Sequence, residues 1–402
     1  MKVYLVGGAV RDTLLGLPIV EKDWVVVGAT PKKLLDKGYK QVGKDFPVFL
    51  HPKTSEEYAL ARTERKQGSG YYGFTCNYDS SVTLTEDLAR RDLTINAMAM
   101  DDKGQIIDPY HGQDDIKAKI IRHVSPAFIE DPVRVLRVAR FTARFKPLGF
   151  MLANDTRKLM YEMVRNGELD HLVSERVWQE WFRSLSEIRP DVFITTLRCC
   201  GALKVVLPEL NQLFGVPLSP VLYPEVDCGE HTLNVLRATC KLTDDAMIRF
   251  ASITYAIGKG LTSMGQWPDH NGYEQLGLEA LESLAKRLRV PSDYRKFARM
   301  ACQYVAVLQN LDDLDANEVV AVLEKVDAFR RPLLLKQLLV LCQAEWMCMG
   351  KAFNLSDIWE HALVECQQIS VQSVIEEGYQ GEKIKTELHK RRVNRLQSIL
   401  KK

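Results

Sequence analysis

Two acidic residues and two glycines near the start of the chain have the types and spacing that phosphate chemistry requires. Glu21 and Asp23 stand two positions apart at the start of a β-branched run, where the period of a strand places both carboxylates on one face. Gly7 and Gly8 end an earlier apolar run, and a glycine turn before a helix lets the backbone approach a phosphate. These features predict a Mg²⁺ held by Glu21 and Asp23 beside bound phosphate. Taken singly, a Gly-Gly turn is weak evidence and a Glu-x-Asp pair at a strand edge is usually solvated.

A row of basic residues forms the second chemical feature. Asp131 and Pro132 predict the start of a helix that runs to about Phe145, with Asp131 as its N-cap. At 100° per residue, the face opposite the apolar side chains carries four arginines: Arg134, Arg137, Arg140 and Arg144. Such a row suits two tasks, binding a triphosphate and reading a nucleobase through hydrogen bonds from an Asp and Arg pair. Helix capping is the alternative role for Asp131.

An arginine and an aspartate also occur within an apolar helical pattern further upstream. The spacing predicts one helix from about Leu84 to Met100, with Arg91 inside its apolar stripe and Asp92 at the edge of that stripe. A charge in that position needs a partner. A triphosphate would suit the guanidinium of Arg91, and an internal ion pair is the alternative.

The elements that must position these residues form a small mixed sheet with helices. Apolar runs at 3–6 and 23–27 predict strands, Thr30 and Pro31 begin a helix, and runs at 46–50 and 57–61 predict a hairpin. Residues 62–81 show no period, and their glycines, basic residues and aromatics predict a mobile loop that touches phosphate and stacks on a base, or a plain surface loop. The rest of the chain is mainly helical.

Composition sets the outer limits of the function. A chain of 402 residues suggests two to four domains, and its formal charge of +2 requires any nucleic acid to be bound by local basic faces. The sequence contains neither a signal pattern nor an apolar run of about 20 residues, so a cytoplasmic protein is expected. The nine cysteines form no Cys-x-x-Cys pair and are typical of core positions.

Four segments together resemble one known family. They are Gly-Gly-Ala-Val-Arg-Asp at 7–12, Glu-x-Asp at 21–23, Arg-Arg-Asp-Leu-Thr-Ile-Asn-Ala at 90–97 and Glu-Asp-x-x-Arg at 130–134. This set resembles the polymerase-β-like nucleotidyltransferases, specifically the CCA-adding tRNA nucleotidyltransferases and bacterial poly(A) polymerases. The resemblance is strong over residues 1–145, moderate to about 260 and weak beyond. It departs at Glu21, where an Asp is usual.

The resemblance implies an α+β fold, with a small mixed-sheet polymerase-β-like nucleotidyltransferase head followed by an all-α neck, body and tail. The predicted parts are 1–125, 126–215, 216–345 and 346–402, with proline-rich residues 215–224 as the main boundary. Residues 229–260 resemble an HD phosphohydrolase domain whose metal site is degraded, since Tyr255 and Ala256 replace its His-Asp pair. The basic last helix, 381–402, suits an RNA backbone, although a solvated helix is the alternative.

The implied activity is the addition of C, C and A to the 3′ end of tRNA from CTP and ATP, with release of pyrophosphate. Glu21 and Asp23 would be the catalytic and metal-binding residues for Mg²⁺. The nucleotide would bind to Gly8, Arg11, Arg91, Asp92, Asn96, Asp131, Arg134, Arg137 and Arg140. The alternatives are a CC-only or A-only enzyme, a poly(A) polymerase, and a non-catalytic tRNA-binding protein. The sequence leaves the oligomeric state open.

Overall fold

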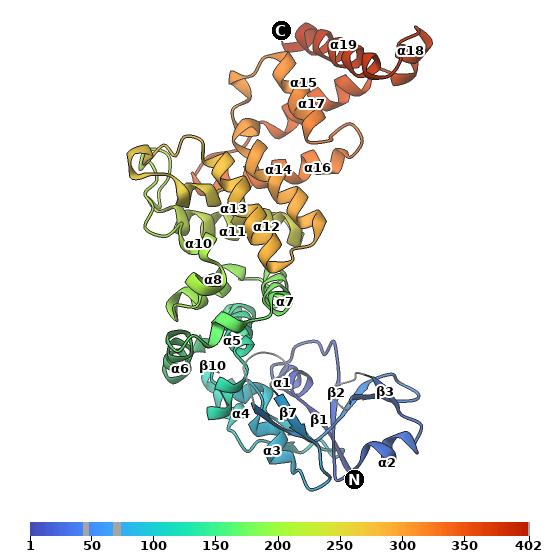
Figure 1. The fold of residues 1–402 in the computed structure, drawn as a ribbon, viewed down its shortest axis with the longest axis vertical. Helices are drawn as coiled ribbons and strands as arrows, with labels where there is room; N and C mark the ends of the chain where they lie inside the picture. Colours follow the sequence, from blue (N-terminus) through green and yellow to red (C-terminus); the bar gives the residue numbers. More distant parts are fainter. Residues whose placement is uncertain (43–47, 67–73, 401–402) are drawn as a thin grey trace. The chain divides into compact units, whose positions relative to one another are not determined.

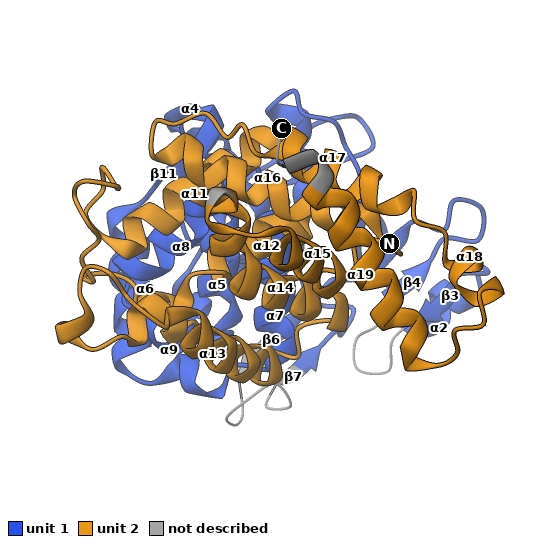
Figure 2. Ribbon diagram, turned by 90° about the horizontal axis from the view of Figure 1, so that it is seen from above, with its two compact units in different colours: residues 1–206 blue, residues 207–402 orange. Residues whose placement is uncertain are grey.

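The protein is described by a computed structural model that covers residues 1–42, 48–66 and 74–400 (Figure 1). The chain forms two compact units, Met1–Val206 and Leu207–Lys402, which Figure 2 colours separately. The finer division into head, neck, body and tail stays a prediction. Within the described ranges, no helix has the length and apolar character needed to cross a membrane.

The N-terminal unit contains the predicted mixed sheet. Its seven strands follow the order β3-β4-β5-β2-β1-β8-β9, and only the β2–β5 pair among these neighbours is parallel. The strands are β1 Lys2–Val6, β2 Asp23–Val27, β3 Lys40–Val42, β4 Val48–Leu50, β5 Glu57–Leu60, β8 Ala99–Met100 and β9 Ile106–Ile107. Val6 at the end of β1 pairs with Asp23 at the start of β2. This register brings the Gly7-Gly8 turn next to Asp23.

Helices cover both faces of the central strand β2. Val25 packs in one cluster with Leu88 of α3 (Leu84–Ala89), whereas Val26 packs in another with Leu34 of α2 (Pro31–Leu35). Both valines are 1% exposed. Because a strand buried on both faces is held rigidly, Asp23 at its start has a fixed position.

The predicted helix from 84 to 100 is wrong beyond Ala89. After α3 the backbone is extended at Leu93, forms a short 3-10 helix at Thr94–Asn96 and then enters β8. The cause is tertiary pairing, since the Thr94 N–H donates to the Arg122 carbonyl and the Val124 N–H to the Asp92 carbonyl. These partners satisfy the backbone in place of a helical ladder.

The predicted loop from 62 to 81 is also wrong in part. β6 (Thr63–Lys66) and β7 (Phe74–Asn77) pair antiparallel in a two-stranded ribbon, and residues 67–73 lie outside the described residues. The ribbon forms a separate sheet from the seven strands. Backbone pairing in such a ribbon does not require the alternation of apolar and polar residues on which a sequence-based strand prediction depends.

A helical layer completes the N-terminal unit. α5 (Val133–Phe145) packs against α7 (Ser174–Leu185) and α8 (Pro190–Cys199), and it follows a 3-10 helix at Pro126–Glu130. The unit also contains α1 Gly8–Leu14, α4 Gly112–Ala118, α6 Asn154–Arg165, α9 Leu203–Val206 and the parallel pair β10 Ile120–Ile121 and β11 Met151–Leu152. Asp131 is not the N-cap that was predicted, because the helix begins at Val133 and Pro132 occupies the N-cap position. Asp131 lies one residue earlier, and its Oδ1 accepts a hydrogen bond from the Val133 N–H at 3.1 Å.

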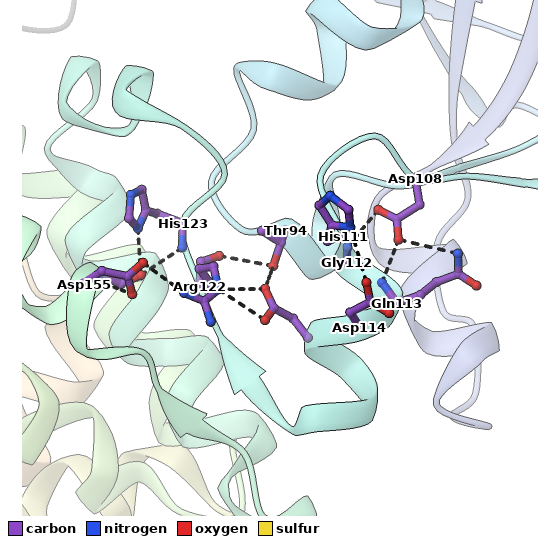
Figure 3. Close-up of polar contacts among 11 residues, drawn as sticks. Thr94, Asp108, His111, Gly112, Gln113, Asp114, Arg122, His123 and Asp155 are labelled. Carbon is purple, nitrogen blue, oxygen red and sulfur yellow. Dashed lines mark hydrogen bonds and ion pairs between the residues drawn. The ribbon is translucent and has the colours of Figure 1, made fainter.

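Helix α4 holds the segment 94–96 in place through its contacts with Thr94 (Figure 3). Asp108 caps this helix by accepting hydrogen bonds from the N–H groups of Gly112 and Gln113, each at 2.8 Å. A Cβ atom on Gly112 would lie 2.4 Å from the Thr94 carbonyl oxygen, so this close approach requires glycine. The Thr94 hydroxyl donates to Asp115 of α4 at 2.7 Å. The segment that carries Asn96 is therefore held by both backbone and side chain.

The C-terminal unit is helical, as predicted, and a large apolar cluster lies within it. The unit contains the predicted basic last helix, 381–402, at Glu382–Leu400. Its helices are α10 Pro208–Asn211, α11 Cys228–Leu242, α12 Ala246–Thr254, α13 Tyr273–Leu288, α14 Ser292–Gln309, α15 Ala316–Lys325, α16 Pro332–Cys348, α17 Ser356–Gln367, α18 Val371–Glu376 and α19 Glu382–Leu400.

Candidate active site

A cavity of about 780 Å³ opens within the N-terminal unit. Its volume is in the range that small ligands and cofactors occupy. It gathers every predicted site residue except Glu21, together with further arginines. Its described lining is Gly7, Gly8, Arg11, Asp23, Arg62, Arg90, Arg91, Asp92, Asn96, Asp131, Arg134, Arg137, Arg140, Phe141, Arg144, Val173, Arg176 and Gln179. Because arginines predominate in this lining, the cavity suits a polyanionic guest.

The glycine turn shapes one wall of the cavity. Gly7 has φ +69°, in the left-handed region, and a Cβ atom there would lie 2.9 Å from Nη1 of Arg91. Glycine at this position therefore provides both the turn and the space for a guanidinium. The same Nη1 donates to the Asn96 carbonyl at 3.5 Å, and Nη2 donates to buried Asp87 at 3.3 Å. The Nε of Arg91 is buried without a partner among the described residues, which leaves a donor for an anion.

Arg11 lies at the centre of a buried network. Its guanidinium donates to both oxygens of Asp12, each at 2.9 Å, and to the Asn96 side-chain oxygen. Asn96 in turn donates to Asp92 Oδ1 at 3.0 Å. Burial lowers the pKa of Arg11, while Asp12 opposes this shift. The Gly-Gly segment and the Arg-Arg-Asp segment thus meet through side chains, although about 85 residues separate them in the chain.

Three arginines of the α5 row are paired with acids from other segments of the chain. Arg137 Nε donates to Asp92 Oδ2 at 2.7 Å, Arg140 Nε donates to Glu180 of α7 at 2.6 Å, and Arg144 reaches Asp12 at 3.2 Å. These acids come from distant segments, so a search for partners within one helix could not find them. Arg140 is 7% exposed and still lines the cavity.

Asp92 is held as a charged carboxylate. Burial raises its pKa, but Arg137 and hydrogen bonds from the Asn96 side chain and the Leu93 N–H outweigh burial and hold the pKa of Asp92 far below its usual range. In return, the charge of Asp92 raises the pKa of Arg137. The pair is therefore fully ionised at neutral pH, and it fixes the orientation of a cavity-lining guanidinium.

Phe141 supports three guanidiniums and was not predicted as a site residue. The guanidinium carbons of Arg140, Arg11 and Arg137 lie 4.4, 5.3 and 5.6 Å from the centroid of its ring. Cation–π attraction of this kind contributes about 0.5–1 kcal/mol at exposed sites and about 2 kcal/mol or more where the contact is desolvated. On sequence alone the apolar ring was indistinguishable from a core residue of α5.

Asp131 and Arg134, the candidate base-reading residues, both line the cavity, but each side chain binds a different partner. Arg134 is buried and donates to two main-chain carbonyls, of Ala127 at 2.6 Å and of Arg90 at 2.7 Å. Asp131 instead binds Arg176 of α7 through two hydrogen bonds of 3.1 and 2.7 Å. Arg176 and Glu180 were both missed, because their partners lie 45 and 40 residues away and no local pattern marks them.

The two candidate metal ligands lie at the start of β2. Asp23 lines the cavity, whereas Glu21 precedes the strand and lies outside the lining. Desolvation raises the pKa of Asp23, Arg91 lowers it, and the neighbouring charge of Glu21 raises it again. Two carboxylates that repel each other are stabilised by a divalent cation. No cluster of three or more His, Cys, Asp or Glu side chains could hold a metal in the described part of the chain. The pair of carboxylates suits a divalent cation that completes its shell with phosphate oxygens and water.

The HD-like region of the C-terminal unit contains a buried polar cluster. The Nδ1 of His231 donates to the Glu225 carboxylate at 3.1 Å, and its Nε2 lies 3.9 Å from buried Glu345. Tyr255 and Ala256 are buried core residues. Desolvation raises the pKa of Tyr255 well above its usual value, so this hydroxyl is a neutral group rather than a metal ligand.

Fold and cavity are those of a polymerase-β-like nucleotidyltransferase. Residues 3–122 match the family described as "Poly A polymerase head domain", and residues 149–214 match the one described as "Probable RNA and SrmB- binding site of polymerase A". The curated "Multifunctional CCA protein" of Legionella pneumophila (strain Paris) is 54% identical over 402 residues, which cover 100% of this chain and 98% of that protein. The chain belongs to the family of CCA-adding tRNA nucleotidyltransferases.

Solved structures agree with the fold. The Thermotoga maritima CCA-adding enzyme complexed with tRNA superposes with a TM-score of 0.63 at 20% identity, over 98% of this chain and 87% of that one. A tRNA nucleotidyltransferase complexed with a primer tRNA and an incoming ATP analog superposes with a TM-score of 0.60 at 24% identity, over 92% and 97% of the two chains. At these identities the likeness concerns the fold.

Proposed function

We propose that this protein adds the sequence CCA to the 3′ end of tRNA, using CTP and ATP as substrates and no nucleic-acid template. Family membership along the whole chain, combined with an arginine-lined cavity around Asp23, carries this assignment. Relatives of this fold are known in complexes with tRNA and with an ATP analog. The expected cytoplasmic location stays a prediction.

The cavity suggests how the reaction proceeds. The tRNA 3′-hydroxyl attacks the α-phosphorus of the nucleotide in line and its proton passes to solvent, while the bond from this phosphorus to the bridging oxygen breaks and pyrophosphate leaves. Glu21 and Asp23 would hold Mg²⁺, which supplies Lewis-acid stabilisation of the attacking and leaving oxygens. Arg91, whose buried Nε has no hydrogen-bond partner in the described part of the chain, would bind the triphosphate. Arg137 and Arg140, oriented by their acids, would stabilise the charge that develops on pyrophosphate.

A transfer assay tests the assignment. Purified protein receives tRNA ending before CCA, after CC, or complete, with one labelled nucleotide at a time. We expect CMP incorporation on the first substrate, AMP incorporation on the second and none on the third. Asp23→Ala should abolish both incorporations while tRNA binding persists, because the metal-dependent step is common to both nucleotides.

The alternatives give different patterns in the same assay. A CC-only enzyme would not extend the CC-ending tRNA, an A-only enzyme would not use the tRNA that lacks CCA, and a poly(A) polymerase would add AMP repeatedly. A non-catalytic tRNA-binding protein would incorporate nothing. Incorporation that survives in Asp23→Ala would contradict the assignment of the catalytic carboxylate. The central part of the loop predicted to touch phosphate and a base, residues 67–73, lies outside the described residues.

A further inference from the structure

Asp131 has almost all of its acceptor positions filled by the protein itself. A carboxylate offers about four lone-pair positions. Oδ1 accepts from the Val133 N–H at 3.1 Å and from Arg176 Nη1 at 3.1 Å, and Oδ2 accepts from Arg176 Nη2 at 2.7 Å. Within the described part of the chain, no other donor reaches this carboxylate. One acceptor position, on Oδ2, therefore remains at the cavity wall.

A single carboxylate acceptor discriminates between nucleobases. Cytosine and adenine each present an exocyclic amino group, a donor, where uracil and guanine present a carbonyl oxygen, an acceptor. A charged carboxylate binds the amino group and repels the carbonyl. A freely rotating Asp131 would discriminate less, because it could turn its charge away from a carbonyl or accept a ring N–H instead.

We infer that Arg176 of α7 is a positioning residue that sets the base selectivity of the cavity, by holding Asp131 with one acceptor position open to an amino-bearing base. The inference rests on the proposed function and deepens it. The planar guanidinium fork is essential, since two parallel hydrogen bonds fix the plane of the carboxylate and the single charge of a lysine does not. α5 provides the acceptor, and α7 provides its orientation.

The test compares Arg176→Lys and Arg176→Met with the wild type. Equilibrium binding of CTP, ATP, UTP and GTP is measured first, and kcat/KM for each nucleotide on tRNA lacking CCA or ending in CC is measured second. We expect both variants to reduce the preference for CTP and ATP over UTP and GTP by about 10- to 150-fold, the range of one hydrogen bond to a charged group. Arg165→Met is the matched control, since Arg165 is an exposed arginine of α6.

The outcomes separate the two proposals. One outcome would support the role of Arg176 and refute the proposed function: the variants bind CTP and ATP with a reduced preference, and the wild type itself transfers no nucleotide. Loss of affinity for all four nucleotides by the same factor would overturn the inference, as would a wild type that binds all four equally. Arg176→Lys is expected to fold, because the Arg176 side chain is 29% exposed. Full selectivity in that variant would show that charge alone suffices and would also overturn the inference.

Discussion

Removing the charge of Glu180 should destabilise the free protein and tighten nucleotide binding at the same time. In Glu180→Gln the side chain keeps its size but no longer neutralises Arg140, at 2.6 Å, and Arg137, at 3.9 Å. The side chains of Glu180 and Arg140 are 6% and 9% exposed, so solvent screens the lost interaction weakly. The two arginines then need another anion, and a triphosphate in the cavity can provide it.

The size of the effect follows from the contacts. A hydrogen bond to a charged group contributes about 1.5–3 kcal/mol and a neutral one about 0.5–1.5 kcal/mol, whereas breaking a buried ion pair outright costs about 3–5 kcal/mol. Glutamine retains a hydrogen bond, and Arg140 keeps its contact with Phe141. We therefore expect a loss of about 1–3 kcal/mol in the free energy of unfolding of the N-terminal unit. Tenfold tighter binding of ATP would restore about 1.4 kcal/mol at saturation.

Urea unfolding with and without ATP measures both quantities. Trp178 and Trp181 lie on the same helix as Glu180 and report its unfolding by fluorescence. Glu162→Gln, the same change at an exposed position of α6, serves as the control and should alter neither quantity. An unchanged stability of Glu180→Gln, or weaker binding of ATP, would refute the idea that Glu180 balances the cavity charge.

Three further predictions concern other parts of the molecule. Gly7→Ala should weaken nucleotide binding more than it lowers Tm, because its Cβ displaces Arg91; unchanged affinity would contradict this. Because the pKa of Asp92 is depressed in the folded state, its charge stabilises the fold above about pH 4, and this stabilisation is lost as the pH falls further. Asp92→Asn should therefore unfold at a lower urea concentration at pH 7, and its free energy of unfolding should depend less steeply on pH in acid. The protein should show no phosphatase or phosphodiesterase activity with Ni²⁺, Mn²⁺ or Mg²⁺; hydrolysis that persists in Asp23→Ala and disappears in His231→Ala would overturn this.

The sequence predicted the elements whose signals are local. The mixed sheet, the turn at Gly7-Gly8 and most helices follow from apolar periodicity, capping residues and glycine, and the structure contains them. The resemblance to a known family assigned distant residues to one site, which local patterns could not do. All of these predicted site residues except Glu21 line one cavity. The roles of these residues stay predictions until the variants are measured.

The failures have a common physical cause. The apolar spacing of a helix continues past Ala89, so the sequence predicted a helix there. The backbone groups that compete with the helix, around Arg122, lie some 30 residues downstream and leave no local signal. The ribbon of β6 and β7 was missed because its pairing leaves no apolar alternation in the sequence. Glu180 and Arg176 carry no local signal, since a carboxylate or guanidinium becomes a site residue only through a partner that folding brings to it.

The ion pairs of the cavity constrain how this gene can be recombined with those of its relatives. Asp12 binds Arg144 and Asp92 binds Arg137, so both pairs span the predicted head boundary at residue 125. A chimera joined there would take the two halves of each ion pair from different proteins, so the charges would not match even if each half folded well. Crossovers near residue 206, between the two compact units, would transfer the cavity intact. For directed evolution, the transferable module is thus the whole N-terminal unit rather than its sheet.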